Sequence, residues 1–333
     1  MAPRSLKARW IFPISQPPIE NGVLHIENHR IVGVSTEDET AEDLGDVAIL
    51  PGFVNAHTHL DLTGARGRIP PRRDFTGWLR EVIASRREDV KADIEQGLRE
   101  SIASGATLLC DISVGGQSWD VLKDAPIRSV VCHELIGLKK ERAEQSLNAF
   151  HRWLDQIEST PNCRPGVSPH APYSVRRSLF QSVAKMKSPV TIHLAETKEE
   201  LELLANRQGP FRQFLEDVGA WCEDDLCHSP QEVLDIFADH ESTLFAHGNY
   251  LTEASPKTAI VYCPRTHAAF EHEPHPLLTS ENATIALGTD SLASNPDLNI
   301  LAEARFLRSR CPEISPELIL KMLTIHGARA LGW

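Results

Sequence analysis

The sequence has no excess of basic residues and no long apolar run. Its 34 lysines and arginines are outnumbered by 46 aspartates and glutamates, which gives a formal net charge of -12. Proteins that bind nucleic acid or anionic membranes need the opposite balance, because Lys and Arg displace the counterions of phosphates. No apolar run approaches the ~20 residues of a membrane-spanning helix. We therefore expect no nucleic-acid partner and no membrane partner.

The cysteine pattern of a disulfide framework or a zinc finger is also lacking. The seven cysteines are odd in number and form no Cys-x-x-Cys pair. Cys110, Cys132 and Cys263 lie in apolar, strand-like runs, where a thiol behaves as a small buried hydrophobe. Residues 1–18 are interrupted by prolines and lack the apolar region of a secretory signal. Reduced cysteines and no signal together predict a cytoplasmic location.

The chain does contain enough apolar residues for a large core, since 41% of its 333 residues are hydrophobic. Before residue 50, short strands are predicted at 8–14, 22–26 and 30–34, with a tight turn between the last two. We expect residues 1–50 to form a small β subdomain and residues 51–333 to form a larger domain.

From residue 49 onward, apolar strand-like runs alternate with amphipathic helical stretches. Such alternation indicates a parallel sheet covered by helices, and eight units fit a closed barrel. The alternative is a doubly wound open sheet, but no Gly-x-Gly-x-x-Gly follows any strand. We predict an α/β fold, a (β/α)8 TIM barrel with a small, incomplete N-terminal β-sheet subdomain. The predicted strands are 49–59, 107–113, 128–137, 164–171, 190–196, 243–250, 259–265 and 284–291, and the predicted helices are 75–104, 141–157, 175–187, 198–218, 231–240 and 298–310.

Two histidines stand at the end of the first predicted barrel strand. Side chains alternate along a strand, so His57 and His59 should project from the same face. Two imidazoles on one face can bind a metal such as zinc, although a lone His-x-His is weak support. Further candidates close later strands, where the active sites of barrels gather. These candidates are His170, His193, Glu196, His247 and Asp290.

With these residues in place, the sequence resembles the amidohydrolase superfamily, in its aminohydrolase branch of cytosine and nucleoside deaminases and triazine chlorohydrolases. The resemblance implies a metal-dependent hydrolase of C–N bonds other than peptide bonds. The matching segments are 51–59, 170–173, 193–196, 247–249, 263–265 and 288–295.

The resemblance implies one divalent ion, Zn²⁺ or alternatively Fe²⁺, because no lysine stands on the fourth strand where binuclear relatives carry a bridging group. Glu196 would shuttle protons, His247 would stabilise the oxyanion, and Asp290 would also accept a proton from the attacking water. Hydroxide generated at the metal would then replace an amino group on a nitrogen heterocycle or nucleoside, adenosine-like or aminodeoxyfutalosine-like. The implied metal ligands are His57, His59, His193 and Asp290.

Substrate contacts are expected from Trp78, Arg87, His170 and Arg265. An arginine near position 87 would suit an anionic group on the substrate, and a solvated helix face is the alternative. The partner expected is a small heterocyclic molecule. Relatives continue some tens of residues beyond the segment that resembles 328–332. We therefore expect the N-terminal strands to form a reduced sheet, to cover a barrel edge, or to pair with another subunit in a homo-oligomer.

Two other functions use the same residues. The site could expel chloride or open a cyclic amide, or the chain could be an inactive scaffold. The His-x-Glu and Pro-Cys-x-x-Cys motifs of the cytidine-deaminase fold are absent, which excludes that class.

Overall fold

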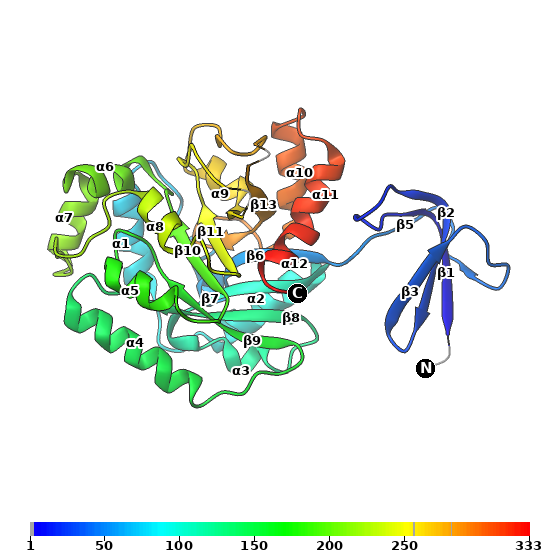
Figure 1. The fold of residues 1–333 in the computed structure, drawn as a ribbon, viewed down its shortest axis with the longest axis horizontal. Helices are drawn as coiled ribbons and strands as arrows, with labels where there is room; N and C mark the ends of the chain where they lie inside the picture. Colours follow the sequence, from blue (N-terminus) through cyan, green and yellow to red (C-terminus); the bar gives the residue numbers. More distant parts are fainter. Residues whose placement is uncertain (1–2, 256, 281) are drawn as a thin grey trace. The chain divides into compact units, whose positions relative to one another are not determined.

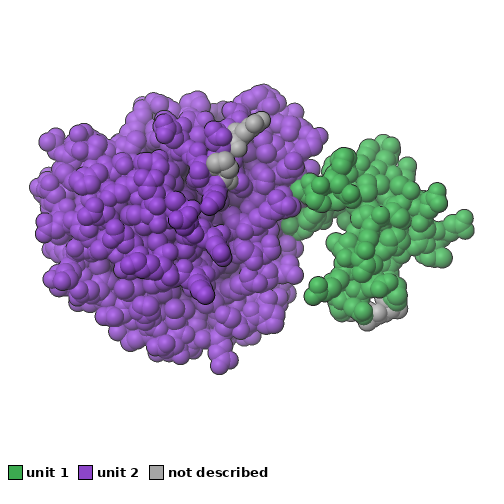
Figure 2. Space-filling view, in the orientation of Figure 1, with its two compact units in different colours: residues 1–52 green, residues 53–333 purple. Residues whose placement is uncertain are grey.

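The computed structural model describes residues 3–255, 257–280 and 282–333. The chain divides into two compact units, residues 1–52 and residues 53–333, which Figure 2 distinguishes by colour. Among the described residues, none of the helices has the length and hydropathy required to span a bilayer. All seven cysteines are free, as predicted.

Unit 1 is a small sheet of short strands. The order is β3-β2-β1-β4, with β5 also pairing with β1. The predicted hairpin between β2 and β3 is confirmed, because Asn28 and His29 both adopt the left-handed conformation, with φ of 47° and 64°. The strands are β1 (Arg4–Ile11), β2 (Ile19–Glu27), β3 (Arg30–Ser35), β4 (Glu42–Asp43) and β5 (Ala48–Ile49).

Unit 2 is a parallel barrel with helices around the strands (Figure 1). The order β13-β12-β11-β10-β9-β8-β7-β6-β14 follows the chain, and β14 pairs with β6, which closes the sheet. Each predicted barrel strand is found, with ends shifted by a few residues. The strands are β6 (Phe53–His59), β7 (Ala106–Ser113), β8 (Arg128–Leu135), β9 (Cys163–Pro169), β10 (Val190–Leu194), β11 (Thr243–His247), β12 (Ala259–Tyr262), β13 (Thr284–Leu287) and β14 (Asp290–Ser291).

The eighth barrel strand is broken into β13 and β14 by Gly288 and Thr289. Asn55 holds this break, because its amide donates to Thr289 Oγ1 at 2.8 Å and accepts from the Thr289 N–H at 3.1 Å. A side chain at Gly288 would not fit, since a Cβ there would lie 2.9 Å from the Cβ of His57. The predicted single strand is therefore two strands, and Asp290 stands directly after the break.

Two of the predicted helices are each divided in two. The first is interrupted where Arg86 becomes extended, with ψ of 140°. The second is interrupted at Arg207 and Gly209, which have φ of 59° and 90°, and Pro210 then begins the next helix. The helices of unit 2 are η1 (Leu60–Ala65), α1 (Phe75–Ser85), α2 (Lys91–Ala103), η2 (Val114–Gly116), α3 (Trp119–Leu122), α4 (Lys140–Leu154), α5 (Arg177–Val183), α6 (Lys198–Asn206), α7 (Pro210–Asp217), α8 (Pro230–Ile236), α9 (Pro264–Ala269), α10 (Ile300–Arg310), α11 (Pro316–Leu323) and α12 (Ile325–Ala330).

The barrel core has two layers. The larger cluster of buried side chains joins the strands to the helices, and it includes Leu109, Phe150 and Phe180. A smaller cluster consists of alternate residues of neighbouring strands, such as Leu108 and Cys110 of β7 and Val130 and Cys132 of β8. Alternate residues face the inside of a barrel, so this second cluster fills the interior and holds the strand ends in place.

Candidate metal and active site

The carboxyl end of β6 carries two buried histidines on one face. The ring centroids of His57 and His59 are 5.0 Å apart. Neither ring nitrogen of His57 has a hydrogen-bond partner among the described residues, although the side chain is wholly buried. A buried imidazole without a partner is unfavourable unless a ligand takes one of its nitrogens. A metal ion would satisfy this requirement.

His193 at β10 and Asp290 at β14 converge on the same point. Nε2 of His193 lies 3.3 Å from Nε2 of His59, and Oδ1 of Asp290 lies 3.6 Å from Nε2 of both His57 and His59. Donors bound 2.0–2.2 Å from one tetrahedral ion are about 3.3–3.6 Å apart. Three imidazoles and one carboxylate therefore fit a single divalent ion such as zinc. His57 and His193 also form a second possible donor group with His247.

Hydrogen bonds orient two of these donors. Nδ1 of His193 lies 3.1 Å from the carbonyl oxygen of His170, which leaves Nε2 free for a metal. The hydroxyl of Ser294 donates to Oδ2 of Asp290 at 2.8 Å, which leaves Oδ1 facing the histidines. Sequence reasoning did not assign Ser294 a role, although it lies in the same segment as Asp290.

Glu196 and His247 lie beside the donor cluster, the name we give to His57, His59, His193 and Asp290. Nε2 of His247 lies 3.4 Å from Oε1 of Glu196, and both side chains are buried. Ala195 and His247 adopt left-handed conformations, with φ of 49° and 70°. Such values are uncommon outside glycine, and they turn the chain sharply where the two strands end. An acid and an imidazole therefore stand together at the site.

Glu200 fixes the segment that carries Glu196. The carboxylate of Glu200 is fully buried and accepts the backbone N–H groups of Ala195 and Glu196, both at 2.9 Å. The hydroxyl of Thr197 in turn accepts the N–H of Glu200 at 3.2 Å. Sequence reasoning missed this clamp, and the Thr-x-x-Glu capping pattern was the signal that could have found it.

The surroundings set different protonation states for the acids and imidazoles. Burial raises the pKa of Glu196 well above its usual value, and Asp290 and Glu200 raise it further. Burial lowers the pKa of His247 to about 3. Burial alone would also raise the pKa of Asp290. The neighbouring imidazoles, chiefly that of His57, have the larger effect, and the pKa of Asp290 is lowered. The site thus combines an acid whose pKa is raised, an imidazole that is neutral at neutral pH and a carboxylate whose pKa is lowered.

A cavity of 420 Å³ adjoins the donor cluster at His170. The ring of His170 lies 4.9 Å from that of His193, between centroids, and its Nδ1 lies 2.7 Å from the Ser174 hydroxyl. The sequence therefore placed His170 correctly at the mouth of the fourth strand. We call this space the His170 cavity, and its walls include Val82, Arg86, Glu134, His170, Tyr173 and Phe214.

Arg86, and not Arg87, lines the His170 cavity. The guanidinium of Arg87 pairs with Asp93 and is half exposed. Nη1 of Arg86 donates to Oδ2 of Asp61 at 2.8 Å. The two arginines separate because α1 ends between Ser85 and Arg86, a boundary that the predicted continuous helix did not contain.

The side chains of Trp78 and Arg265 make hydrogen bonds and ion pairs with other residues of the protein. The indole N–H of Trp78 donates to the carbonyl of Ala293 at 3.3 Å. The guanidinium of Arg265 is 13% exposed and pairs with Asp297 at 2.8 Å and Glu303 at 2.7 Å. Their contact with a substrate stays a prediction.

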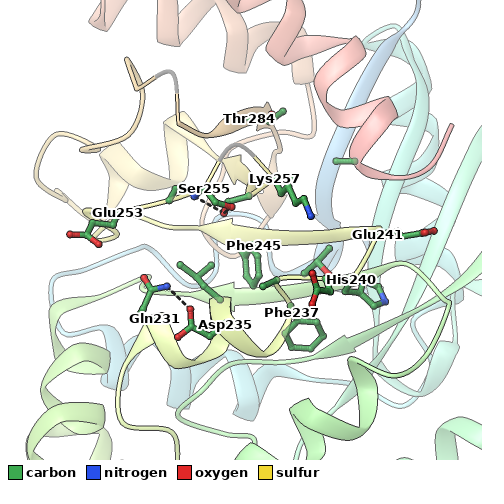
Figure 3. Close-up of a pocket in the computed structure, with 18 of the residues that line it drawn as sticks. Gln231, Asp235, Phe237, His240, Glu241, Phe245, Glu253, Ser255, Lys257 and Thr284 are labelled. Atoms are coloured by element: carbon green, nitrogen blue, oxygen red, sulfur yellow. Dashed lines mark hydrogen bonds between the residues drawn. The ribbon is translucent and has the colours of Figure 1, made fainter.

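A cavity of 690 Å³ lies at the other end of the strands (Figure 3). Its lining includes Thr243, Ala259 and Thr284, which begin β11, β12 and β13. In Figure 3, Gln231 and Asp235 are joined by a hydrogen bond at its edge. None of the candidate metal ligands lines this cavity, and barrel chemistry belongs to the carboxyl ends of strands.

Comparison with known proteins matches residues 48–333 to the Amidohydrolase family. The 5-methylthioadenosine/S-adenosylhomocysteine deaminase of Moorella thermoacetica is 29% identical over 370 residues, which cover 98% of this chain and 80% of that protein. The adenosine deaminase of Helicobacter pylori is 26% identical over 333 residues, which cover 93% of this chain and 80% of that protein.

Solved structures share the fold. The aminofutalosine deaminase of Helicobacter pylori, in complex with methylthio-coformycin, aligns with a TM-score of 0.85 and 23% identity, covering 99% of this chain and 88% of that one. The adenosine deaminase of Xanthomonas campestris with bound zinc aligns with a TM-score of 0.75 and 22% identity, covering 98% and 80%. These alignments confirm the predicted (β/α)8 barrel. The matched residues, from 48 to the end, show that the chain belongs to the amidohydrolase family, and its deaminase relatives indicate a hydrolase that acts on C–N bonds.

Proposed function

We propose that the protein is a metal-dependent deaminase, with one ion, that replaces an amino group on an adenine-like ring with a hydroxyl group. The observation that carries this proposal is the convergence of His57, His59, His193 and Asp290 beside the pair formed by Glu196 and His247. The relatives named deaminases support the same reaction for this chain. Their names favour an adenine nucleoside as the substrate.

The resident ion in this proposal is Zn²⁺, with Fe²⁺ as the alternative. His57, His59, His193 and Asp290 would hold it, since their donor atoms have the spacing that one ion needs. The bound ion would act as a Lewis acid that lowers the pKa of water to about 7. We also propose a cytoplasmic location, which the free cysteines support.

In the proposed reaction, Glu196 and Asp290 transfer protons and His247 donates a hydrogen bond. Glu196, whose pKa is raised by burial, is placed to give a proton to a ring nitrogen, which makes the adjacent amino-bearing carbon electrophilic. Asp290, ionised, can accept the proton that the attacking water loses. His247 is neutral and can donate a hydrogen bond to the oxygen on which negative charge develops. The amino group then leaves as ammonia with the proton that Asp290 accepted, and the proton of the new hydroxyl group can return to Glu196.

Ammonia release from a panel of compounds tests the proposal. The panel contains adenosine, 5′-methylthioadenosine, S-adenosylhomocysteine, guanine, cytosine and a chlorinated triazine, and metal content is measured on the same preparation. We expect ammonia from at least one adenine nucleoside and about one zinc or iron per chain. Chloride release from the triazine without ammonia from any compound would instead identify a chlorohydrolase. A preparation that binds no metal and converts nothing would identify a scaffold.

A further inference from the structure

Glu134 is a buried carboxylate that faces the His170 cavity without a partner. It lies near the end of β8, and its side chain is 6% exposed. The one basic group among the described residues within 4.0 Å is His170, whose Nε2 lies 4.0 Å from Oε1, too far for a hydrogen bond.

Two other buried glutamates of this barrel do have hydrogen-bond partners. Glu200 accepts two backbone N–H groups, and Glu303 binds Arg265 and the amide of Asn295. Leaving a buried carboxylate without donors is unfavourable. Glu134 is therefore placed where the donors can come from a bound molecule.

The rim of the cavity indicates a ligand larger than a single ring. The described residues of unit 2 include three large apolar side chains that are strongly exposed, Ile83 at 48%, Ile136 at 39% and Val218 at 49%. All three line the His170 cavity. Apolar side chains that gather at the mouth of a cavity mark a binding surface. A ligand held at the donor cluster can thus extend past His170 to this rim.

We propose that Glu134 is a specificity-determining residue that accepts hydrogen bonds from the sugar hydroxyls of the substrate, so that the enzyme acts on nucleosides and discriminates against free bases. This inference rests on the proposed function. A base held at the donor cluster directs its sugar past His170, where two hydroxyl groups can donate to the two oxygens of Glu134. A carboxylate that receives two such bonds is satisfied, and the polar edge of the sugar is recognised.

The test compares adenosine, 2′-deoxyadenosine, 3′-deoxyadenosine and adenine in the zinc-loaded wild-type protein and in Glu134→Leu and Glu134→Gln. Glu144→Gln, on the exposed face of α4, is the matched control. We expect Glu134→Leu to lower kcat/KM for adenosine about 10–100-fold, mainly through KM. Its rate with adenine should not change. In the wild type, kcat/KM should be lower for each deoxynucleoside than for adenosine, by part of this factor. In Glu134→Leu, adenosine and the deoxynucleosides should have equal kcat/KM.

Two results would overturn the proposal. One is equal kcat/KM for adenosine and both deoxynucleosides in the wild type. The other is an equal loss on adenosine and adenine in Glu134→Leu, accompanied by a lower Tm, which would assign a structural role. Removal of an unpartnered buried carboxylate should leave the Tm unchanged or raise it.

Calorimetric titration with inosine separates this inference from the proposed reaction. If no compound releases ammonia, the deaminase proposal fails, but tighter binding of inosine to the wild type than to Glu134→Leu still supports the role of Glu134. Equal binding of inosine to both proteins, or no binding to the wild type, would contradict that role. Glu134→Gln keeps one acceptor oxygen and should fall between the two.

Discussion

At the scale of single residues, neighbouring groups shift the pKa values of two buried carboxyl groups in opposite directions. Glu196 and Asp290 are both buried, but imidazoles lower the pKa of Asp290, whereas the carboxyl groups of Asp290 and Glu200 raise that of Glu196. The pKa of Glu196 is raised and that of Asp290 is lowered. One group can thus donate a proton at the pH at which the other accepts one, which is how a single site performs acid and base chemistry.

Replacement of Glu196 tests the proton transfer. We expect Glu196→Gln to lower kcat about 10²–10⁴-fold, because an amide cannot deliver a proton to the ring nitrogen. The metal content should not change, since Glu196 is not among the proposed ligands. Elemental analysis and steady-state kinetics check both statements. Glu202→Gln, on the exposed side of α6, should behave as the wild type does, and a variant of Glu196 with full kcat would contradict the role.

Asp111 provides a prediction about pH and stability. This carboxyl group is fully buried and accepts the N–H of Leu60 at 2.8 Å. Burial raises its pKa from 3.8 to about 8. A raised folded-state pKa means that the folded protein holds the proton more tightly than the unfolded chain does. The stability that this group contributes is therefore complete below about pH 4 and is lost as the pH rises to 8.

Asp111→Asn keeps the acceptor oxygen but cannot ionise. We expect its free energy of unfolding to match the wild type near pH 4 and to exceed it by a few kcal/mol near pH 8. Urea unfolding at several pH values checks this. A difference between the two proteins that does not vary with pH would show that Asp111 titrates normally.

At the scale of elements, the site depends on where strands end and helices begin. β6, β10 and β11 deliver candidate functional side chains at or near their carboxyl ends, and β14 begins with Asp290. The ends themselves are fixed by contacts such as those of Glu200 with the segment after β10 and of Asn55 with the break before β14. α9 and α10 are joined in a similar way by Arg265 and Glu303.

The ion pair of Arg265 with Glu303 gives an element-scale prediction. Glu303 is 0% exposed, so loss of its partner leaves a buried charge unpaired. We expect Arg265→Ala to lower the free energy of unfolding by roughly 3–5 kcal/mol. Denaturant unfolding measures this, and kinetics on the folded fraction test the predicted substrate contact. A variant with normal stability and a raised KM would favour contact with substrate over a structural role.

At the scale of the whole molecule, the metal should stabilise the barrel as well as supply chemistry. The proposed ligands come from three separate strands, so an ion that binds them holds distant parts of the chain together. We expect dialysis against a chelator to lower the Tm and abolish activity. One equivalent of zinc should restore both. Calorimetry with and without metal checks this, and an unchanged Tm after verified removal of the ion would contradict it.

The sequence by itself determined the barrel and most of the candidate site. Local patterns were sufficient for this, because alternation along β6 places His57 and His59 on one face and parallel strands bring their carboxyl ends together. The order of motifs then predicted His193 and Asp290 at neighbouring positions. The division into residues 1–50 and 51–333, and the oligomeric state, stay predictions.

Tertiary structure alone decided the surroundings of these residues. Hydrogen bonds between residues far apart in the sequence, such as that of Asn55 with Thr289, broke the last strand and placed Asp290. Because α1 ends at Ser85, Arg86 lines the His170 cavity in place of the predicted Arg87. In the sequence, Glu134 is one residue of an apolar strand. Only the packed structure shows that its carboxylate faces a cavity without a hydrogen-bond partner. Burial and pairing depend on the whole packed chain, and no local pattern of residues contains them.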